Sequence, residues 1–406
     1  MAVDWGHLVG EVGQTSGAVF RALAVGEGVS TLGDQLARVA VAVLVFDATG
    51  SAAAAALTYA ATLLPDLVAG PLLVPLADRY PRRRVMAVAA LVQALLSAVL
   101  AIPSAPVALI VAAIAGIAAA GAPFRAAQAV TVRAVLPAEV HGRGQARMSM
   151  VREAGQLAGL GLAAVVVGLV GVNAAFLINA GSFALVAVLV LAYVPALPAP
   201  ARGPDRVRGT GLRLLWDDRR LRVLNALVLV GTLAILPDAV MVPLVVAMGA
   251  PDWVVGPLLA ADVVGFLLAS LVLDRRDDAT RRALIGPLVV LSVLPLAGFL
   301  VNPGPWTAAV LLVLSGVGAA HIPAVRAAVL ELVPDEAAGR TVGWVRTGLR
   351  AGQGLGVVVG GVLADVLTPA GAIGAVGVAG TAAALVGAAA WHRRPPDRAG
   401  RLGVSV

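Results

Sequence analysis

The sequence predicts an all-α integral membrane protein: twelve transmembrane helices in two pseudo-symmetric six-helix bundles, with the N- and C-termini in the cytoplasm. The first observation is composition, because 60% of the 406 residues are hydrophobic and only 13% are charged, whereas soluble chains carry about 25% charged residues. The second is that long apolar runs alternate with short polar breaks. The third is that every second break is rich in Arg.

The apolar runs are long enough to cross a bilayer, since about 20 apolar residues span its hydrocarbon core as a helix. They are also continuous, which argues against the short alternating strands of a membrane β-barrel. The predicted helices cover, in chain order, residues 19–45, 52–76, 85–102, 106–128, 148–170, 173–195, 221–247, 253–273, 282–301, 306–328, 342–366 and 370–391.

The polar breaks give the orientation. All 30 basic residues are Arg, and Arg near helix ends stays on the cytoplasmic side. The Arg-rich breaks are at 78–84, 133–147, 202–222, 275–282, 340–350 and after 392, and the Arg-free breaks are near 46–51, 103–105, 171–173, 249–253, 302–305 and 366–370. The net charge of +7 therefore reflects topology and contact with anionic lipid headgroups, and we expect no nucleic-acid partner.

The chain repeats itself, which predicts its domains. At a shift of 197 positions eight residues match without a gap. They are Pro137, Glu139, Gly142, Arg143, Ala154, Gly155, Gln156 and Gly159, which fall on Pro334, Glu336, Gly339, Arg340, Ala351, Gly352, Gln353 and Gly356. Parallel halves of this kind are a transporter architecture. We expect a bundle at 1–195, a cytoplasmic linker at 196–220, a second bundle at 221–392 and a cytoplasmic tail at 393–406.

The break after the second predicted helix carries a motif. Residues 76–84 read L-A-D-R-Y-P-R-R-R and resemble the loop 2–3 signature of the major facilitator superfamily, G-x-L-a-D-r-x-G-r-r. Val74 and Pro81 replace its two glycines, and the proline variant resembles the branch that contains multidrug and enterobactin exporters. The resemblance extends over nearly the whole chain in helix count, topology and repeat. It implies the major facilitator fold and a secondary transporter.

The same resemblance implies a cytoplasmic gate. In the superfamily the acid and arginines of this loop form a charge network with helix 11, which implies that role for Asp78, Arg79, Arg82 and Arg83. The alternative is that the arginines only set topology, and it stays open for Arg79, Arg83 and Arg84. Asp78 does nothing for topology, so its presence favours the gate.

Four further polar residues occupy related places in the two halves. Arg125, at the inner end of the fourth helix, resembles an Arg found there in many exporters, and Arg326 holds a similar place in the second half. Both are interpreted as gate elements first and coupling residues second. Gln156 and Gln353 lie in A-G-Q-x-x-G runs and are candidates for a polar cavity, and the glycines beside them allow close helix approach.

Acidic residues in the middle of predicted helices are the main functional signal, because a charge at mid-bilayer costs about 2.5–3.5 kcal/mol or more. Burial disfavours the charged form of a carboxyl group, so such a group can take up and release a proton or attract a cationic substrate. The candidates are Asp34 and Asp66, their repeat-related partners Asp238 and Asp262, and Glu27 nearer the cytoplasm.

Structural interpretations compete with these roles. Arg38 follows Asp34 by four residues, so the two lie on one helix face and can form an ion pair, which would make Asp34 structural. Asp262 can simply face a polar partner. Asp66 has no basic neighbour in its helix, which favours a functional role. Asp66 and Asp238 each follow a proline, which frees a backbone carbonyl and favours a kink.

The sequence therefore predicts a proton-coupled secondary transporter in the inner (plasma) membrane that exports a small amphipathic molecule, such as a drug, antibiotic or siderophore, by alternating access. Its expected partners are the lipid bilayer, protons and a small-molecule substrate, and it is expected to be a monomer. The alternatives are an importer or uniporter of a metabolite, or a receptor or scaffold that has lost transport. With no Lys and no Cys, and no nucleophile–base pair or metal-ligand cluster, we expect no enzyme, cofactor or metal.

Overall fold

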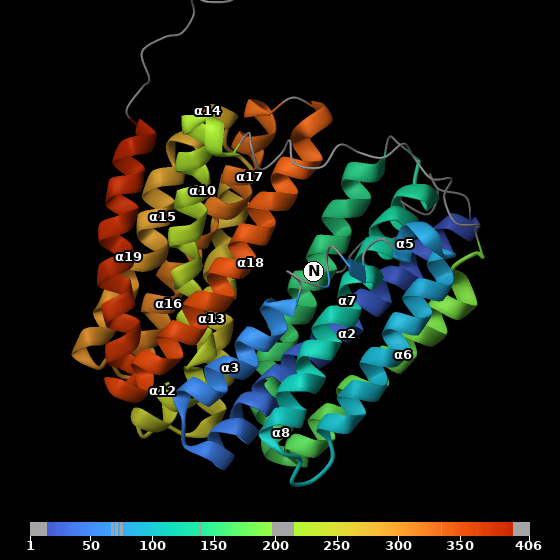
Figure 1. The fold of residues 1–406 in the computed structure, drawn as a ribbon, viewed down its shortest axis with the longest axis horizontal. Helices are drawn as coiled ribbons and strands as arrows, with labels where there is room; N and C mark the ends of the chain where they lie inside the picture. Colours follow the sequence, from blue (N-terminus) through green and yellow to red (C-terminus); the bar gives the residue numbers. More distant parts are fainter. Residues whose placement is uncertain are drawn as a thin grey trace, which may run out of the picture. The chain divides into compact units, whose positions relative to one another are not determined.

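The computed structural model describes residues 14–65, 69, 72–73, 76–137, 140–196, 215–333 and 335–392, and every regular element among them is a helix (Figure 1). The chain forms two compact units. The first comprises Met1–Arg206, Ile235–Ala260 and Gln353–Ala372, and the second comprises Val207–Ala234, Ala261–Gly352 and Ile373–Val406. Most of the predicted linker and the whole predicted tail lie outside the described residues, and the division into two six-helix bundles stays a prediction.

The first unit is built on four long helices, which run alongside one another in Figure 1. They are α2 (Gln14–Thr49), α6 (Arg82–Leu100), α7 (Val107–Val135) and α8 (His141–Tyr193). Shorter elements of this unit are α3 (Ala52–Leu63), α5 (Leu76–Arg79), α11 (Leu236–Ala239), α12 (Met241–Ala247) and η3 (Asp252–Val254).

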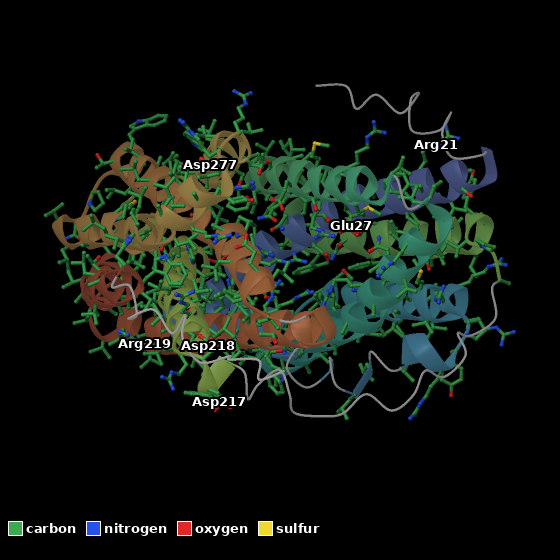
Figure 2. All side chains as sticks on the ribbon, turned by 90° about the horizontal axis from the view of Figure 1, so that it is seen from above. Arg21, Glu27, Asp217, Asp218, Arg219 and Asp277 are labelled. Carbon is green, nitrogen blue, oxygen red and sulfur yellow. The ribbon has the colours of Figure 1, made fainter. Side chains whose placement is uncertain are left out.

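The second unit contains α10 (Arg219–Gly231), α14 (Asp278–Ala283), α15 (Ile285–Val293), η4 (Leu294–Val301), α16 (Pro305–Ala319) and α17 (His321–Leu332). Four elements pass from one unit to the other along the chain: η2 (Thr232–Ile235), α13 (Val255–Leu273), α18 (Asp335–Val366) and α19 (Pro369–His392). Asp217, Asp218 and Arg219 lie together where α10 begins (Figure 2), and the Asp218 carboxylate caps that helix by accepting from the backbone N–H of Arg220 at 2.6 Å.

The long helix α8 contains two predicted helices. Its backbone leaves the helical region at Gly171, where φ is 81° and ψ is 166°. Glycine adopts a positive φ without the steric penalty that a Cβ imposes, so the chain changes direction there. The break falls inside the Arg-free break predicted at 171–173.

The predicted helix over 221–247 is interrupted in the middle of its length. After α10 come the 3₁₀ turn η2, the short helix α11 and a non-helical residue, Val240, before α12 resumes. Pro237 lies in α11 and Pro243 in α12, and each proline lacks the N–H that would continue the helical hydrogen-bond pattern. The kink that the prolines favoured is therefore present, and Asp238 lies in it.

Glycines bring helices into close contact in both units, and Gly155, in an A-G-Q-x-x-G run, is one that the sequence predicted. A Cβ atom added to Gly155 of α8 would lie 2.8 Å from the carbonyl oxygen of Gly28 in α2. In the second unit a Cβ on Gly316 of α16 would clash with the backbone carbonyl oxygen of Asp262 in α13. At these two crossings backbone meets backbone, which is how helices pack in membranes.

Length and apolarity confirm the membrane class. Nine helices among the described residues are long and apolar enough to cross a bilayer, and two shorter apolar helices, 52–63 and 285–301, accompany them. On α6, Val88, Leu91 and Leu95 are 52–66% exposed, and an apolar stripe of this kind suits contact with lipid. The count of twelve helices and the cytoplasmic termini stay predictions.

Candidate functional site

Asp34 lies in α2 and is held by a chain of polar groups. The Nδ2 group of Asn179 in α8 donates a hydrogen bond to Asp34 Oδ1 at 3.4 Å. The hydroxyl of Ser182 donates to the Asn179 backbone carbonyl at 2.7 Å and contacts Asn179 Oδ1 at 3.2 Å. Because Ser182 occupies the amide oxygen, the NH₂ group of Asn179 is left to face Asp34. Gly33 makes this possible, since a Cβ there would lie 2.6 Å from Asn179 Oδ1.

Arg38 lies one turn further along α2 and faces a different partner, Tyr59 of α3. Its guanidinium carbon lies 5.3 Å from the centroid of the Tyr59 ring, a cation–π contact. The Tyr59 hydroxyl donates in turn to Oδ2 of Asp238 at 3.2 Å, and Tyr59 is only 8% exposed. Three elements of the first unit, α2, α3 and α11, thus meet through one aromatic side chain.

The positive charge of Arg38 acts on two acids. It attracts the carboxylate of Asp34 and also that of Asp238. The ion pair between Asp34 and Arg38 stays a prediction, since the contact that the structure gives Arg38 is with the Tyr59 ring. We refer to Asp34, Arg38, Tyr59 and Asp238 as the shared-arginine cluster.

Glu27 forms a second cluster, two turns before Asp34. Its carboxylate accepts from Arg152 Nε of α8 at 2.6 Å and from Gln128 Nε2 of α7 at 3.0 Å. Figure 2 shows Glu27 among the helices of its unit, whereas Arg21 of the same helix lies at the periphery. Glu27 repels the Asp34 carboxylate and Arg125 attracts it, so the two clusters interact electrostatically.

Several of these contacts involve residues that sequence reasoning missed. Arg152 follows Met148, the predicted start of the fifth helix, by four residues, and Asn179 is a lone amide in an apolar run. Both were visible as polar residues inside predicted spans. Tyr59 carried no such signal, because a tyrosine in an Ala-rich helix is equally suited to the core or to the lipid boundary.

The glutamine candidates lie in the first unit. Gln156 and Gln353 are both partly buried. The side-chain oxygen of Gln353 is buried and has no hydrogen-bond partner within the described part of the chain, and the same holds for Gln35, which is adjacent to Asp34. Unsatisfied buried oxygens of this kind require a donor from water or a ligand.

The other mid-helix acids are less defined. Asp262 of α13 is half-buried in the second unit and takes part in a further interaction. Asp66 lies outside the described residues. The part of the chain that the structure describes contains no group of three or more His, Asp or Glu placed to hold a metal ion.

The predicted gate residues are only partly placed. Asp78 lies in α5, with its side chain outside the description, and Arg79 is exposed at the end of that helix. Arg82 begins α6. Arg83 donates from Nη2 to the carbonyl oxygen of Leu191 in α8, a bond within the first unit. Arg125 and Arg326 are both exposed.

A multi-pass helical protein with buried acids and a shared arginine is the kind of protein that moves solutes across membranes. The model of the Major Facilitator Superfamily matches residues 23–300 and 252–405. The chain therefore belongs to the Major Facilitator Superfamily, as the motif at 76–84 had indicated. A comparison with curated protein sequences gives no match.

Solved structures share the fold. A bacterial homologue of the human lysosomal transporter Spinster, in an inward-facing and occupied conformation, gives a TM-score of 0.74 at 13% identity over 93% of this chain and 96% of that chain. The nucleoside transporter NupG gives 0.72 at 13% identity over 93% and 100%. The peptide transporter POT, in complex with sulfate, gives 0.71 at 16% identity over 96% and 98%. With the family match, these likenesses indicate a transporter and not an enzyme.

Proposed function

We propose that this chain is a proton-coupled secondary transporter that exports a small amphipathic molecule by alternating access, with the shared-arginine cluster as its coupling centre. The observation that carries the proposal is that Tyr59 joins Arg38 to Asp238, with its ring against the guanidinium and its hydroxyl donating to the Asp238 carboxylate, while Asp34 lies one turn before Arg38 in α2. In the predicted repeat, Asp34 and Asp238 hold equivalent places in the first helix of each half.

The charges of the cluster favour a proton carrier. Two carboxylates and one guanidinium sum to one negative charge, and an uncompensated charge inside a membrane protein is costly. One proton, or one cationic group of a substrate, neutralises the cluster. Because both compete for the same negative charge, arrival of the proton weakens the hold on the substrate, which is the exchange that an antiporter needs.

Tyr59 lets the cluster sense which acid is charged. Its hydroxyl donates to Asp238, and its ring contacts Arg38. A proton on Asp238 removes the negative charge of that carboxylate and weakens the hydrogen bond. The Arg38 guanidinium then interacts with the Asp34 carboxylate alone. The helix is already interrupted around Asp238. The short helix α11, which carries this carboxylate, can therefore shift without breaking a continuous helix.

Glu27 suits a structural task better. Two donors from two helices satisfy its carboxylate, and the charge of Arg152 compensates it directly. A buried acid paired in this way holds α2, α7 and α8 together near the predicted cytoplasmic end. We propose that Glu27 fixes the geometry of the first unit and acts on Asp34 through its charge.

The remaining candidates keep their predicted roles within this proposal. Asp66 and Asp262 serve coupling or substrate contact, Gln156 and Gln353 line the substrate path, and a cytoplasmic gate is formed by Asp78, Arg79, Arg82, Arg83, Arg125 and Arg326. We also propose that the protein is a monomer of the inner (plasma) membrane, from the branch of multidrug and enterobactin-type exporters. The proline at position 81 supports that branch.

The test is proton movement in inverted membrane vesicles that hold an acid interior, read with a pH-sensitive dye. A panel of lipophilic cations, antibiotics and siderophores is added one compound at a time. We expect one compound class to dissipate the gradient, and we expect Asp34→Asn and Asp238→Asn to abolish that response. Asp47→Asn, which alters an exposed acid of the same helix, is the matched control and should respond like the wild type.

Other results would redirect the proposal. Compound transport without proton movement would indicate a uniporter, and proton-driven accumulation in right-side-out vesicles would indicate an importer. A folded protein that binds a compound and moves neither it nor protons would indicate a receptor or scaffold. A full proton response in both Asn variants would remove the shared-arginine cluster from the mechanism.

A further inference from the structure

A carboxylate at the far end of α18 is bound to the start of α3. Asp365 Oδ2 accepts from the hydroxyl of Ser51 at 2.7 Å, and its Oδ1 accepts from the backbone N–H of Ala52 at 2.6 Å. The N–H of Ala53 lies 3.3 Å from Oδ2. The two backbone donors, Ala52 and Ala53, are among the first N–H groups of the helix, which have no partner within the helix itself. Their positive dipole also favours a carboxylate at this position.

The start of α3 carries two caps. The hydroxyl oxygen of Ser51 accepts from the N–H of Ala54 at 3.1 Å, which is the usual cap by a serine. Asp365 binds the N–H groups that this cap leaves open. The partners lie 314 positions apart in the sequence, in the second and the next-to-last predicted helices, so local folding does not explain the contact.

Close packing continues along the same two helices. A Cβ on Gly361 of α18 would clash with the Cβ of Ala56 in α3, and a Cβ on Gly354 would clash with a methyl group of Leu64. At Gly361 the neighbouring Ala56 Cβ is fixed to the backbone, so a side chain there would push the two helices apart, whereas the Leu64 side chain near Gly354 can move. The α3–α18 contact therefore runs from Gly354 to Asp365, and all of it belongs to the first unit.

The membrane side of this contact follows from the arginine pattern. Ser51 ends the Arg-free break near 46–51, and Asp365 directly precedes the Arg-free break near 366–370. Arg-free breaks face away from the cytoplasm. The carboxylate is also exposed, so water reaches it and its bonds can exchange for water when the helices part.

We propose that Asp365 and the first turn of α3 form a latch that holds the transporter closed toward the outside. For a substrate site to open outward, α3 must leave α18, and the three contacts of Asp365 must break first. The latch depends on alternating access in this family and is independent of the proposed proton coupling, because its parts are distinct from the shared-arginine cluster.

The test uses the absence of cysteine from the chain. Ala56→Cys places a single thiol at a position that is 0% exposed and faces Gly361, so a membrane-impermeant maleimide added outside cells labels it only when α3 leaves α18. With Asp365→Asn in addition, we expect the labelling rate to rise about tenfold, the effect of losing a charged helix cap. Asp47→Asn, an exposed acid on the same side, should leave the rate unchanged.

Two further variants keep the result interpretable. Ser51→Ala removes one donor to Asp365 and should raise the rate by a smaller factor, and Asp365→Glu, which keeps the charge, should restore part of the slow labelling. A second reporter, Ala60→Cys, is also at a position that is 0% exposed. It serves as an independent check in case the Ala56→Cys substitution itself disturbs the packing. Equal labelling rates in the wild type and Asp365→Asn, or an equal rise in Asp47→Asn, would overturn the latch. Neither result depends on substrate or on a proton gradient.

Discussion

Adding one methyl group at Gly155 tests the backbone contact between α2 and α8. Gly155→Ala would place a Cβ 2.8 Å from the Gly28 carbonyl oxygen. Ordinary contacts begin at 3.4 Å, so the two helices must separate by about 0.6 Å, which is 3.4 Å less 2.8 Å. A backbone carbonyl inside a helix cannot turn away, and overpacking of this kind costs about 1–3 kcal/mol.

The same helix supplies the control. Gly161 has nothing within 4 Å of an added Cβ, so Gly161→Ala gains only the better helix propensity of alanine, about 1 kcal/mol. Gly155→Ala makes the same gain, and the difference between the two variants isolates the contact. We therefore expect Gly155→Ala to be less stable than Gly161→Ala by about 1–3 kcal/mol.

The second unit gives an intermediate case. A Cβ on Gly352, the repeat partner of Gly155, would lie 3.0 Å from Oγ1 of Thr232, a side-chain atom that can move. Gly352→Ala should therefore fall between the other two variants. The assay is thermal unfolding in detergent, read by tryptophan fluorescence and confirmed by size-exclusion chromatography. If Gly155→Ala proves as stable as Gly161→Ala, the close approach of α2 and α8 is wrong.

Two further predictions concern single side chains. Tyr59→Phe removes the hydroxyl that donates to Asp238 and keeps the ring beneath Arg38; the loss of one such bond, about 1.4 kcal/mol, should lower kcat/KM for transport about tenfold, whereas Tyr59→Leu should lower it further. Hydrogen bonds from the Thr280 hydroxyl and backbone lower the pKa of Asp277 at the start of α14. The charged Asp277 carboxylate therefore stabilises that helix fully at pH values above the pKa that Asp277 has in the unfolded chain. This contribution is lost as the pH falls through the lower pKa that Asp277 has in the folded protein. The protection factors of α14 amides against hydrogen exchange, which correct for the intrinsic slowing of exchange in acid, should fall with acid in the wild type and lose this dependence in Asp277→Asn.

Much of the architecture could be predicted because a membrane imposes simple rules. Apolar length gave the spans, and the short breaks between apolar runs included the one that contains Gly171. Pro237 marked the interruption of the seventh helix, because a proline removes a backbone donor wherever it stands. The glycines at Gly155 and Gly352 predicted close helix packing, because a residue without a side chain in an apolar helix usually makes room for a neighbour.

The site could be predicted only in part. Asp34 and Asp238 stood out as charges in apolar runs, and Arg38 as a basic residue deep inside the first run. Tyr59 and Asn179 did not, because their importance arises from how α3 and α8 are rotated against α2, and no period in a uniformly apolar helix fixes that rotation. The hydrogen bond from Ser51 to Asp365 could not be predicted either, because it joins the ends of two helices that are remote in sequence.

The most direct test of the account measures proton and substrate flux together in proteoliposomes, using the compound that the vesicle panel identifies. With wild-type protein, we predict that each substrate molecule leaving is matched by a fixed number of protons entering. With Asp238→Asn, substrate should still move down its own gradient while the accompanying proton flux disappears, and Asp47→Asn should match the wild type. An unchanged proton-to-substrate ratio in Asp238→Asn would contradict the claim that the shared-arginine cluster couples the two.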